Sequence, residues 1–228
     1  GKNDFIFYRG AEMKLLPEEV NEDFVVKSKI LHTGSISITC EPCYSAVLQA
    51  IHLAHKYEVF VSFDPNLRPS LWSSLREAKD KTIKCINGAD LVKMNEEELR
   101  FFTGKEDLVK GARWLLQKGP KAVVITQGNK GSFFYNRETL CFIPGYKVKV
   151  ADTLGCGDAF TAAIIYQILL LNKEGQNISF LSEEKIRKSV EFANAAGALA
   201  ATGKGAIPSL PTAEQVKEFL SKRDVQVI

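Results

Sequence analysis

Short apolar segments alternate with amphipathic segments from residue 30 onward, and this alternation constrains the fold more than any other feature. The apolar segments are Ile30–Gly34, Val59–Phe63, Leu91–Met94 and Ala122–Ile125, whose length and β-branched or aromatic residues predict strands. The segments with helical spacing are Glu41–Tyr57, Ser70–Ile86, Glu96–Phe102 and Leu108–Lys118. Because this alternation is typical of parallel sheets covered on both faces, the sequence predicts an α/β fold with a doubly wound, mostly parallel sheet flanked by helices.

The pattern changes in the second half of the chain. Three segments, Ser132–Tyr135, Leu140–Ile143 and Tyr146–Val150, predict an antiparallel extension of the sheet. Helices are expected over Asp158–Leu171, Glu183–Ala201 and Ala213–Leu220, the second of them rich in small residues that allow a neighbour or ligand to come close. Near the N-terminus, Phe5–Tyr8 predicts one more short strand. Since the sequence shows no linker or repeat, we expect a single domain over residues 1–228.

The charge balance indicates a small molecule as partner. Lys and Arg number 30 against 27 Asp and Glu, and no block of like charge forms a nucleic-acid or membrane patch. The most apolar stretch, Ala159–Leu171, is shorter than the ~18 residues that span a bilayer. The segment Gly1–Phe5 has no apolar core of the kind found in a signal peptide, so we expect a cytoplasmic protein with no nucleic-acid or membrane partner.

The cysteines raise one alternative. Five scattered cysteines favour reduced thiols over a disulfide framework. Cys40 and Cys43 have the spacing of a redox motif or of half a zinc site. No second pair of ligands completes a metal site, because the spacings of His32, His52 and His55 do not make a finger pattern. We therefore expect ordinary thiols at both positions.

The segment Ala151–Phe160 carries the strongest chemical signal. Gly155 and Gly157 stand between a predicted strand and a predicted apolar helix. Glycines at a helix N-terminus let backbone N–H groups approach an anion, which the helix dipole also favours, so this segment predicts a phosphate-binding loop. Asp158 follows directly, either as a helix-capping carboxylate or as the base that takes a proton from a hydroxyl attacking the phosphate.

This segment resembles the C-terminal signature of the PfkB, or ribokinase-like, carbohydrate kinases, usually Asp-Thr-Thr-Gly-Ala-Gly-Asp-Ala-Phe, with Leu154 and Cys156 replacing a Thr and an Ala. Other family marks follow in the expected order at Asn95–Glu98, Thr126–Gly131, Ala193–Ala196 and Gly203–Ser209. Phe7–Gly10 and Ser62–Arg68 narrow the resemblance to the branch of fructokinase and 2-keto-3-deoxygluconate kinase. The resemblance covers essentially the whole chain and implies a ribokinase-like fold.

The resemblance also implies roles for individual residues. Gly155, Cys156 and Gly157 would form the anion hole, Asp158 would be the base, and Arg68 would contact the phosphate or a ligand carboxylate. The nucleotide would contact Asn95, Glu98, Thr126, Gly128, Gly131, Asn194, Gly203, Gly205 and Ala206. The sugar would contact Arg9, Gly34, Arg68 and Asp158. The plain alternatives are an acidic turn at residues 95–98, a hairpin turn at 126–131, a hydrogen-bonded helical Asn194 and a surface Arg68.

Two cations are implied beside ATP. Asn95 and Glu98 are three residues apart at a helix start, so they can hold Mg²⁺ through its waters. A monovalent cation such as K⁺ would be held by carbonyl oxygens of Asp152, Leu154, Ala200, Gly205 and Ser209.

The implied activity is ATP-dependent transfer of the γ-phosphoryl group to a sugar hydroxyl, with fructokinase expected and 2-keto-3-deoxygluconate kinase as the alternative. By resemblance, family members begin with roughly a further hundred residues, a length consistent with whole doubly wound domains, that hold a Gly-Gly sugar turn and much of a β lid. We therefore expect residues 1–10 to be a remnant of that lid, and a homodimer through the lid in the longer protein. A nucleotide-binding module without catalysis is the alternative from another class.

Overall fold

The computed structural model describes residues 6–173, 178 and 181–222. Its contacts divide the chain into two compact units, residues 1–123 and 124–228, which are described separately. The single domain expected from the sequence stays a prediction. Within the described residues, no helix combines the length and the apolar character needed to cross a membrane.

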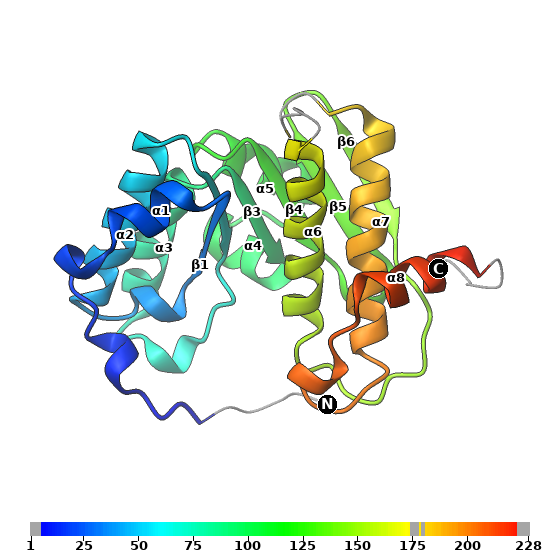
Figure 1. Cartoon of the computed structure of the whole chain (residues 1–228), viewed down its shortest axis with the longest axis horizontal. Coiled ribbons are helices and arrows are strands. Elements are labelled where there is room, and N and C mark those ends of the chain that lie inside the picture. Colours follow the sequence, from blue (N-terminus) through cyan, green and yellow to red (C-terminus); the bar gives the residue numbers. More distant parts are fainter. Residues whose placement is uncertain (1–5, 174–177, 179–180, 223–228) are drawn as a thin grey trace. The chain divides into compact units, whose positions relative to one another are not determined.

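The first unit contains the parallel part of the fold (Figure 1). Its strands are β1 (Ile30–Gly34), β2 (Phe60–Asp64) and β3 (Leu91–Asn95), and its helices are α1 (Glu22–Lys27), α2 (Cys43–Lys56), α3 (Leu75–Asn87), α4 (Glu96–Thr103) and α5 (Leu108–Leu116). β2 pairs in parallel with β1 and β3, as the sequence predicts. In this register Gly34 lies beside Asp64, so the two strands end together. Their carboxyl ends therefore bring the following loops to the same edge.

The second unit contains the antiparallel part and the longest helices. Its elements are β4 (Ala122–Thr126), which starts just before the unit boundary, β5 (Gly131–Asn136), β6 (Leu140–Pro144), α6 (Cys156–Lys173), α7 (Glu183–Ala200) and α8 (Ala213–Ser221). The strand order follows the chain, β1-β2-β3 in the first unit and β4-β5-β6 in the second, and β5 and β6 form the predicted antiparallel hairpin. Helices α6 and α7 lie side by side, and α7 packs on β5 and β6 (Figure 1).

Each unit has its own apolar core, and side-chain caps fix where the helices begin. Phe63, Leu91, Met94 and Phe102 are fully buried in the first unit, and Ile125, Phe134, Ile143 and Ile186 in the second. The capping residues, which accept a hydrogen bond from a backbone N–H in the first turn, are Ser74 for α3, Asn95 for α4, Asp107 for α5, Ser182 for α7 and Thr212 for α8.

Three expectations about secondary structure were wrong. Residues 6–10 form no strand, because no described strand lies beside them and a strand without a partner is unstable in water, while Gly1–Phe5 lie outside the described residues. The helix expected from Ser70 begins only at Leu75, after a 3₁₀ turn over Pro69–Leu71, because Ser74 caps it. In the segment 146–150 only Tyr146 makes a single bridge, and the rest is irregular.

Candidate functional site

A pocket of about 390 Å³ lies in the second unit, where the end of β4, the β5–β6 hairpin and one face each of α6 and α7 meet. It is lined by Thr126, Gly128, Asn129, Gly131, Ser132, Gly145, Tyr146, Val148, Val150, Thr153, Cys156, Gly157, Phe160, Asn194, Gly197, Ala198 and Ala201. Six residues predicted from the sequence are therefore brought together here, namely Thr126, Gly128, Gly131, Cys156, Gly157 and Asn194. Its volume is within the range of small-molecule sites.

Asn194 holds three elements of the pocket wall together. Its side-chain oxygen accepts a hydrogen bond from the Ser132 hydroxyl at 2.6 Å, and its amide nitrogen donates to the carbonyls of Ile143 and Pro144 at 3.1 Å each. Asn194 is 8% exposed and Ser132 is completely buried. The plain alternative of a hydrogen-bonded helical asparagine is thus present, and its polar atoms link α7 to β5 and to the end of β6.

The glycine loop before α6 lies against the loop that follows α7. Gly155 has a φ of +80°, which favours glycine, and a Cβ placed there would come within 3.0 Å of the Cα of Ala206. Asp152 joins the same two loops, because its carboxylate accepts hydrogen bonds from the amides of Leu154 and Gly205, both at 3.0 Å. These hydrogen bonds hold the pKa of Asp152 below its ordinary value.

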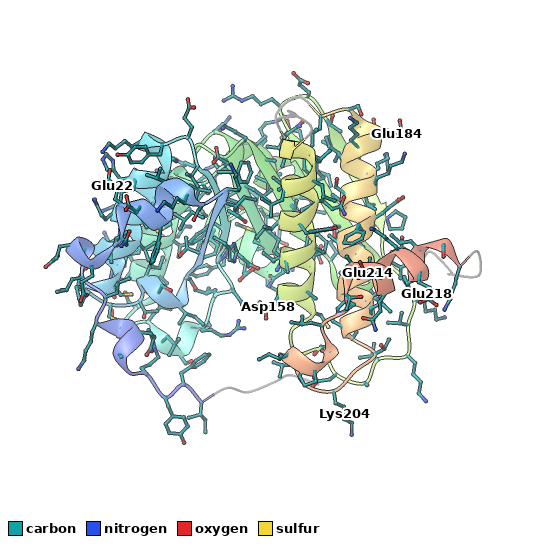
Figure 2. The ribbon with its side chains drawn as sticks, viewed as in Figure 1. Glu22, Asp158, Glu184, Lys204, Glu214 and Glu218 are labelled. Carbon is teal, nitrogen blue, oxygen red and sulfur yellow. The ribbon has the colours of Figure 1, made fainter. Side chains whose placement is uncertain are left out.

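The predicted base lies at the N-terminal end of α6. Figure 2 shows Asp158 there, with Lys204 on the loop after α7 and Glu184 near the other end of the α6–α7 pair. Asp158 is exposed, and its carboxylate makes no hydrogen bond or ion pair within the described part of the chain. Burial and the nearby carboxylates of Asp152 and Asp158 raise the pKa of the Cys156 thiol, so it stays protonated at neutral pH.

Four of the five residues predicted for the monovalent cation, Asp152, Leu154, Gly205 and Ser209, are joined by hydrogen bonds. Asp152 contacts Leu154 and Gly205 through its carboxylate, and the Ser209 hydroxyl donates to the Gly205 carbonyl at 2.5 Å. The Ala200 carbonyl accepts a hydrogen bond from the Gly203 amide at 3.3 Å. Coordination of a cation by these carbonyls stays a prediction.

In the first unit, Asn95 and Glu98 form a reciprocal capping box at the start of α4. The Asn95 side chain accepts from the Glu98 amide at 2.8 Å, and Glu98 accepts from the Asn95 amide at 2.9 Å. The other Glu98 oxygen accepts from the Leu67 amide at 2.7 Å. Burial raises the pKa of Glu98, and the charge of Asp64 adds to this effect. Each Glu98 oxygen already accepts a backbone N–H. Contact of Asn95 and Glu98 with Mg²⁺ therefore stays a prediction, limited to contact through water.

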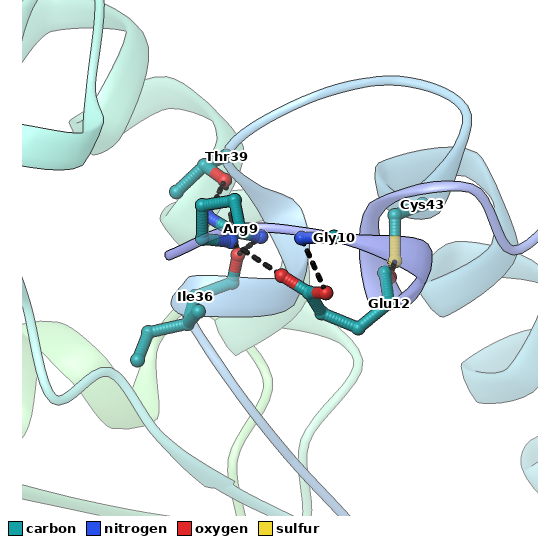
Figure 3. A network of polar contacts seen from close by, with 6 residues as sticks. All are labelled: Arg9, Gly10, Glu12, Ile36, Thr39 and Cys43. Carbon is teal, nitrogen blue, oxygen red and sulfur yellow. Dashed lines mark hydrogen bonds and ion pairs between the residues drawn. The ribbon is translucent and has the colours of Figure 1, made fainter. Parts of the chain in front are cut away.

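The predicted sugar contacts of the first unit lie on two loops. Arg68 follows β2, and its guanidinium donates to the carbonyl of Leu67 at 3.2 Å. Gly34 lies so close to β2 that a Cβ there would be 2.8 Å from the Asp64 carbonyl oxygen. Arg9 contacts Glu12, Thr39 and the Ile36 carbonyl (Figure 3). These contacts use Arg9 to attach the N-terminal segment to the turn after β1.

The Cys40 and Cys43 thiols are both free. Cys43 donates a hydrogen bond to the Glu12 carbonyl at 3.1 Å (Figure 3), and burial raises the pKa of its thiol. A raised pKa is the opposite of what a reactive thiolate needs. Within the described residues, no group of three or more His, Cys, Asp or Glu residues could hold a metal ion.

Sequence reasoning missed the apolar wall of the pocket. Tyr146, Val148, Val150 and Phe160 line it, although their sequence pattern suggested only a strand and a buried helix. Gly197, Ala198 and Ala201 could have been found, because the run of small residues on α7 was the signal for a close neighbour or ligand.

Comparison with known proteins gives the family context. The family model described as "pfkB family carbohydrate kinase" matches residues 1–213. A fructokinase-1 of Oryza sativa subsp. japonica is 40% identical over 96% of this chain and 68% of that protein. A probable fructokinase-6, chloroplastic, of Arabidopsis thaliana is 40% identical over 97% of this chain and 58% of that protein. The chain thus spans about two thirds of the length of the curated relatives it matches.

Solved structures of similar proteins have the same fold. A fructokinase from Vibrio cholerae O395, in a form with bound fructose, ADP and calcium ion, matches 92% of this chain and 65% of that chain, with a TM-score of 0.81 and 31% identity. A fructokinase from Xylella fastidiosa with bound ATP matches 97% of this chain and 71% of that chain, with a TM-score of 0.86 and 25% identity. These matches confirm the ribokinase-like fold class, a mixed sheet flanked by helices.

Proposed function

The chain belongs to the pfkB family of carbohydrate kinases, and on this premise we propose that it is an ATP-dependent sugar kinase, most simply a fructokinase. The observation that carries the proposal is the 390 Å³ pocket, whose lining includes Gly157 of the phosphate-binding loop and the small-residue face of α7. An apolar wall with a few polar groups suits a base, and the N-terminus of α6 suits phosphates. Bound ATP in the Xylella fastidiosa fructokinase supports this assignment.

In the proposed reaction, a sugar hydroxyl oxygen bonds to the γ-phosphorus while the bond between that phosphorus and the bridging oxygen of ADP breaks. Asp158 takes the hydroxyl proton. Its exposed carboxylate makes no hydrogen bond within the described residues, so it is available as an acceptor. The backbone N–H groups at positions 155–157 stabilise the charge on the transferring phosphoryl group, since they lie at the N-terminus of α6, where the helix dipole favours an anion.

Cations would assist this reaction. Mg²⁺ when bound neutralises the phosphate charge, and Asn95 and Glu98 would contact it only through water. A monovalent cation such as K⁺ would be held by carbonyls of the cluster around Asp152 and Gly205. The Vibrio cholerae fructokinase with bound ADP and calcium ion supports a divalent ion.

Fructose is the sugar that the relatives' names support, and 2-keto-3-deoxygluconate is the alternative. A nucleotide-binding module without catalysis is the alternative from another class, because the chain spans about two thirds of its relatives' length. We also propose a cytoplasmic location and a homodimer through the lid. The chloroplastic relative from Arabidopsis thaliana argues against the cytoplasmic location.

The test measures ATP binding by calorimetry and ADP release with fructose or 2-keto-3-deoxygluconate. We expect fructose-dependent ADP release, and Asp158→Asn should lower kcat about 10²–10⁴-fold with ATP binding retained, because the amide cannot accept the proton. Glu184→Gln is the matched control, a carboxylate in the first turn of another helix. ATP binding without turnover on either sugar would favour the module, and no ATP binding would refute the proposed function.

A further inference from the structure

Glu98 connects two segments of the first unit that are about thirty residues apart in sequence. One carboxylate oxygen accepts from the Asn95 amide at 2.9 Å, as an ordinary capping box requires. The other accepts from the Leu67 amide at 2.7 Å, which capping does not require. This second contact attaches the turn after β2 to the start of α4.

The attached turn determines where Arg68 lies. Asn66 has a φ of +41°, in the left-handed region that asparagine adopts more readily than most other non-glycine residues. The guanidinium of Arg68 donates to the carbonyls of Asn66 and Leu67 at 3.4 and 3.2 Å. Since the side chain contacts the backbone of its own turn, a change in the turn moves the guanidinium.

The surroundings of Glu98 make a carboxylate at this buried position energetically unfavourable unless its hydrogen bonds are made. Glu98 is 7% exposed, and the buried ion pair between Lys93 and Asp64, 2.9 Å apart, lies in the same region. The charge of Asp64 disfavours the Glu98 carboxylate, whereas the Asn95 and Leu67 amides and Lys93 favour it. A buried carboxylate is unfavourable unless its hydrogen bonds are satisfied. Glutamine would cap α4 without a charge, so capping alone does not explain a carboxylate here.

We propose that Glu98 is a positioning residue for Arg68, holding the Asn66–Arg68 turn so that the guanidinium can contact the sugar. This inference rests on the proposed function and on the sugar contact that the family resemblance implies for Arg68. It differs from a role for Glu98 toward Mg²⁺, since it predicts an effect on the sugar and not on the metal.

The test replaces Glu98 with glutamine. The side-chain oxygen of glutamine accepts only one of the two amides, and its NH₂ group meets the other donor, so the turn loses its attachment. Glu97→Gln is the matched control, an exposed carboxylate one residue away. Thermal unfolding verifies that both variants fold. Hydrogen exchange measures protection of the Leu67 amide, and steady-state kinetics measure fructose, ATP and Mg²⁺ dependence, with each variant also made in an Arg68→Ala background.

For Glu98→Gln we expect about tenfold or greater loss of Leu67 amide protection and about a tenfold lower kcat/KM for fructose, since small displacements of a positioning group have effects of this size. The half-saturating Mg²⁺ concentration should be unchanged, and the loss should vanish in the Arg68→Ala background. Unchanged Leu67 protection, a shifted Mg²⁺ dependence with unchanged fructose kinetics, or an equal loss in both backgrounds would overturn the inference. If the unmodified chain lacks kinase activity, the proposed function fails separately, and the exchange result alone decides whether Glu98 holds the turn.

Discussion

Replacing Asn194 with alanine should destabilise the second unit and weaken ATP binding together. The substitution leaves the fully buried Ser132 hydroxyl without its acceptor and removes both donors to the β6 carbonyls. An orphaned buried hydroxyl costs about 1–3 kcal/mol, and each of the two lost hydrogen bonds about 1 kcal/mol, so we expect roughly 3–5 kcal/mol of lost stability. For a chain of this size that corresponds to a Tm lower by roughly 6–20 °C. The KM for ATP should rise, because the three wall elements are no longer joined.

Urea denaturation and ATP titration of the same preparations test this prediction. Ser189→Ala is the control on the same helix, because its hydroxyl donates only to the Lys185 carbonyl one turn earlier. The double variant Ser132→Ala with Asn194→Ala should lose less stability than the sum of the single variants, since it contains no orphaned hydroxyl. A loss below about 1 kcal/mol for Asn194→Ala, with an unchanged KM for ATP, would show that the wall does not depend on this side chain.

Two further predictions concern the loops beside α6. Gly155→Ala should lower stability by about 1–3 kcal/mol and raise the KM for ATP, because alanine disfavours the φ of +80° and its Cβ would meet Ala206. Gly10→Ala is the control, because a Cβ there meets nothing closer than 3.4 Å. Equal effects of the two substitutions would contradict the reasoning. Hydrogen bonds from the Leu154 and Gly205 amides hold the folded pKa of Asp152 below its ordinary value, so Asp152 contributes stability above its unfolded pKa that is lost as the pH falls through the folded pKa. Asp152→Asn should therefore flatten the acid limb of the stability profile in urea midpoints measured against pH, whereas the exposed Asp80→Asn should not.

The sequence predicts the strands of this fold well because each strand carries its own local signal. β1 to β6 all occur within a residue or two of the predicted segments, since short apolar runs bounded by turn residues need no distant information. The two strand expectations that were wrong depended on partner strands. Phe5–Tyr8 and Tyr146–Val150 have strand-like composition, but whether such a segment pairs depends on which backbone lies beside it.

The residues of the candidate site also differ in whether local sequence predicts them. The glycine loop and Asp158 were identifiable because backbone approach and helix polarity require particular residues at adjacent positions. The hydrogen-bond partners of Asn194 were not, because Ser132 and Ile143 are 62 and 51 residues away in the chain. Glu98 shows a mixed case, since its capping contact with Asn95 follows from a spacing of three, whereas its contact with Leu67 depends on the fold.

The small-residue face of α7 determines which single substitutions could change the shape of this pocket. Gly197, Ala198 and Ala201 line it from a single helix, whereas a Cβ at Gly131 or Gly145 on the opposite side would clash with backbone atoms. A larger residue at Ala198 would therefore reshape the cavity without rebuilding any loop. If ATP binds in this pocket as proposed, single substitutions on this helix are thus the shortest mutational route to a changed preference among nucleotide bases. An engineered kinase paired with a modified ATP analogue would begin there.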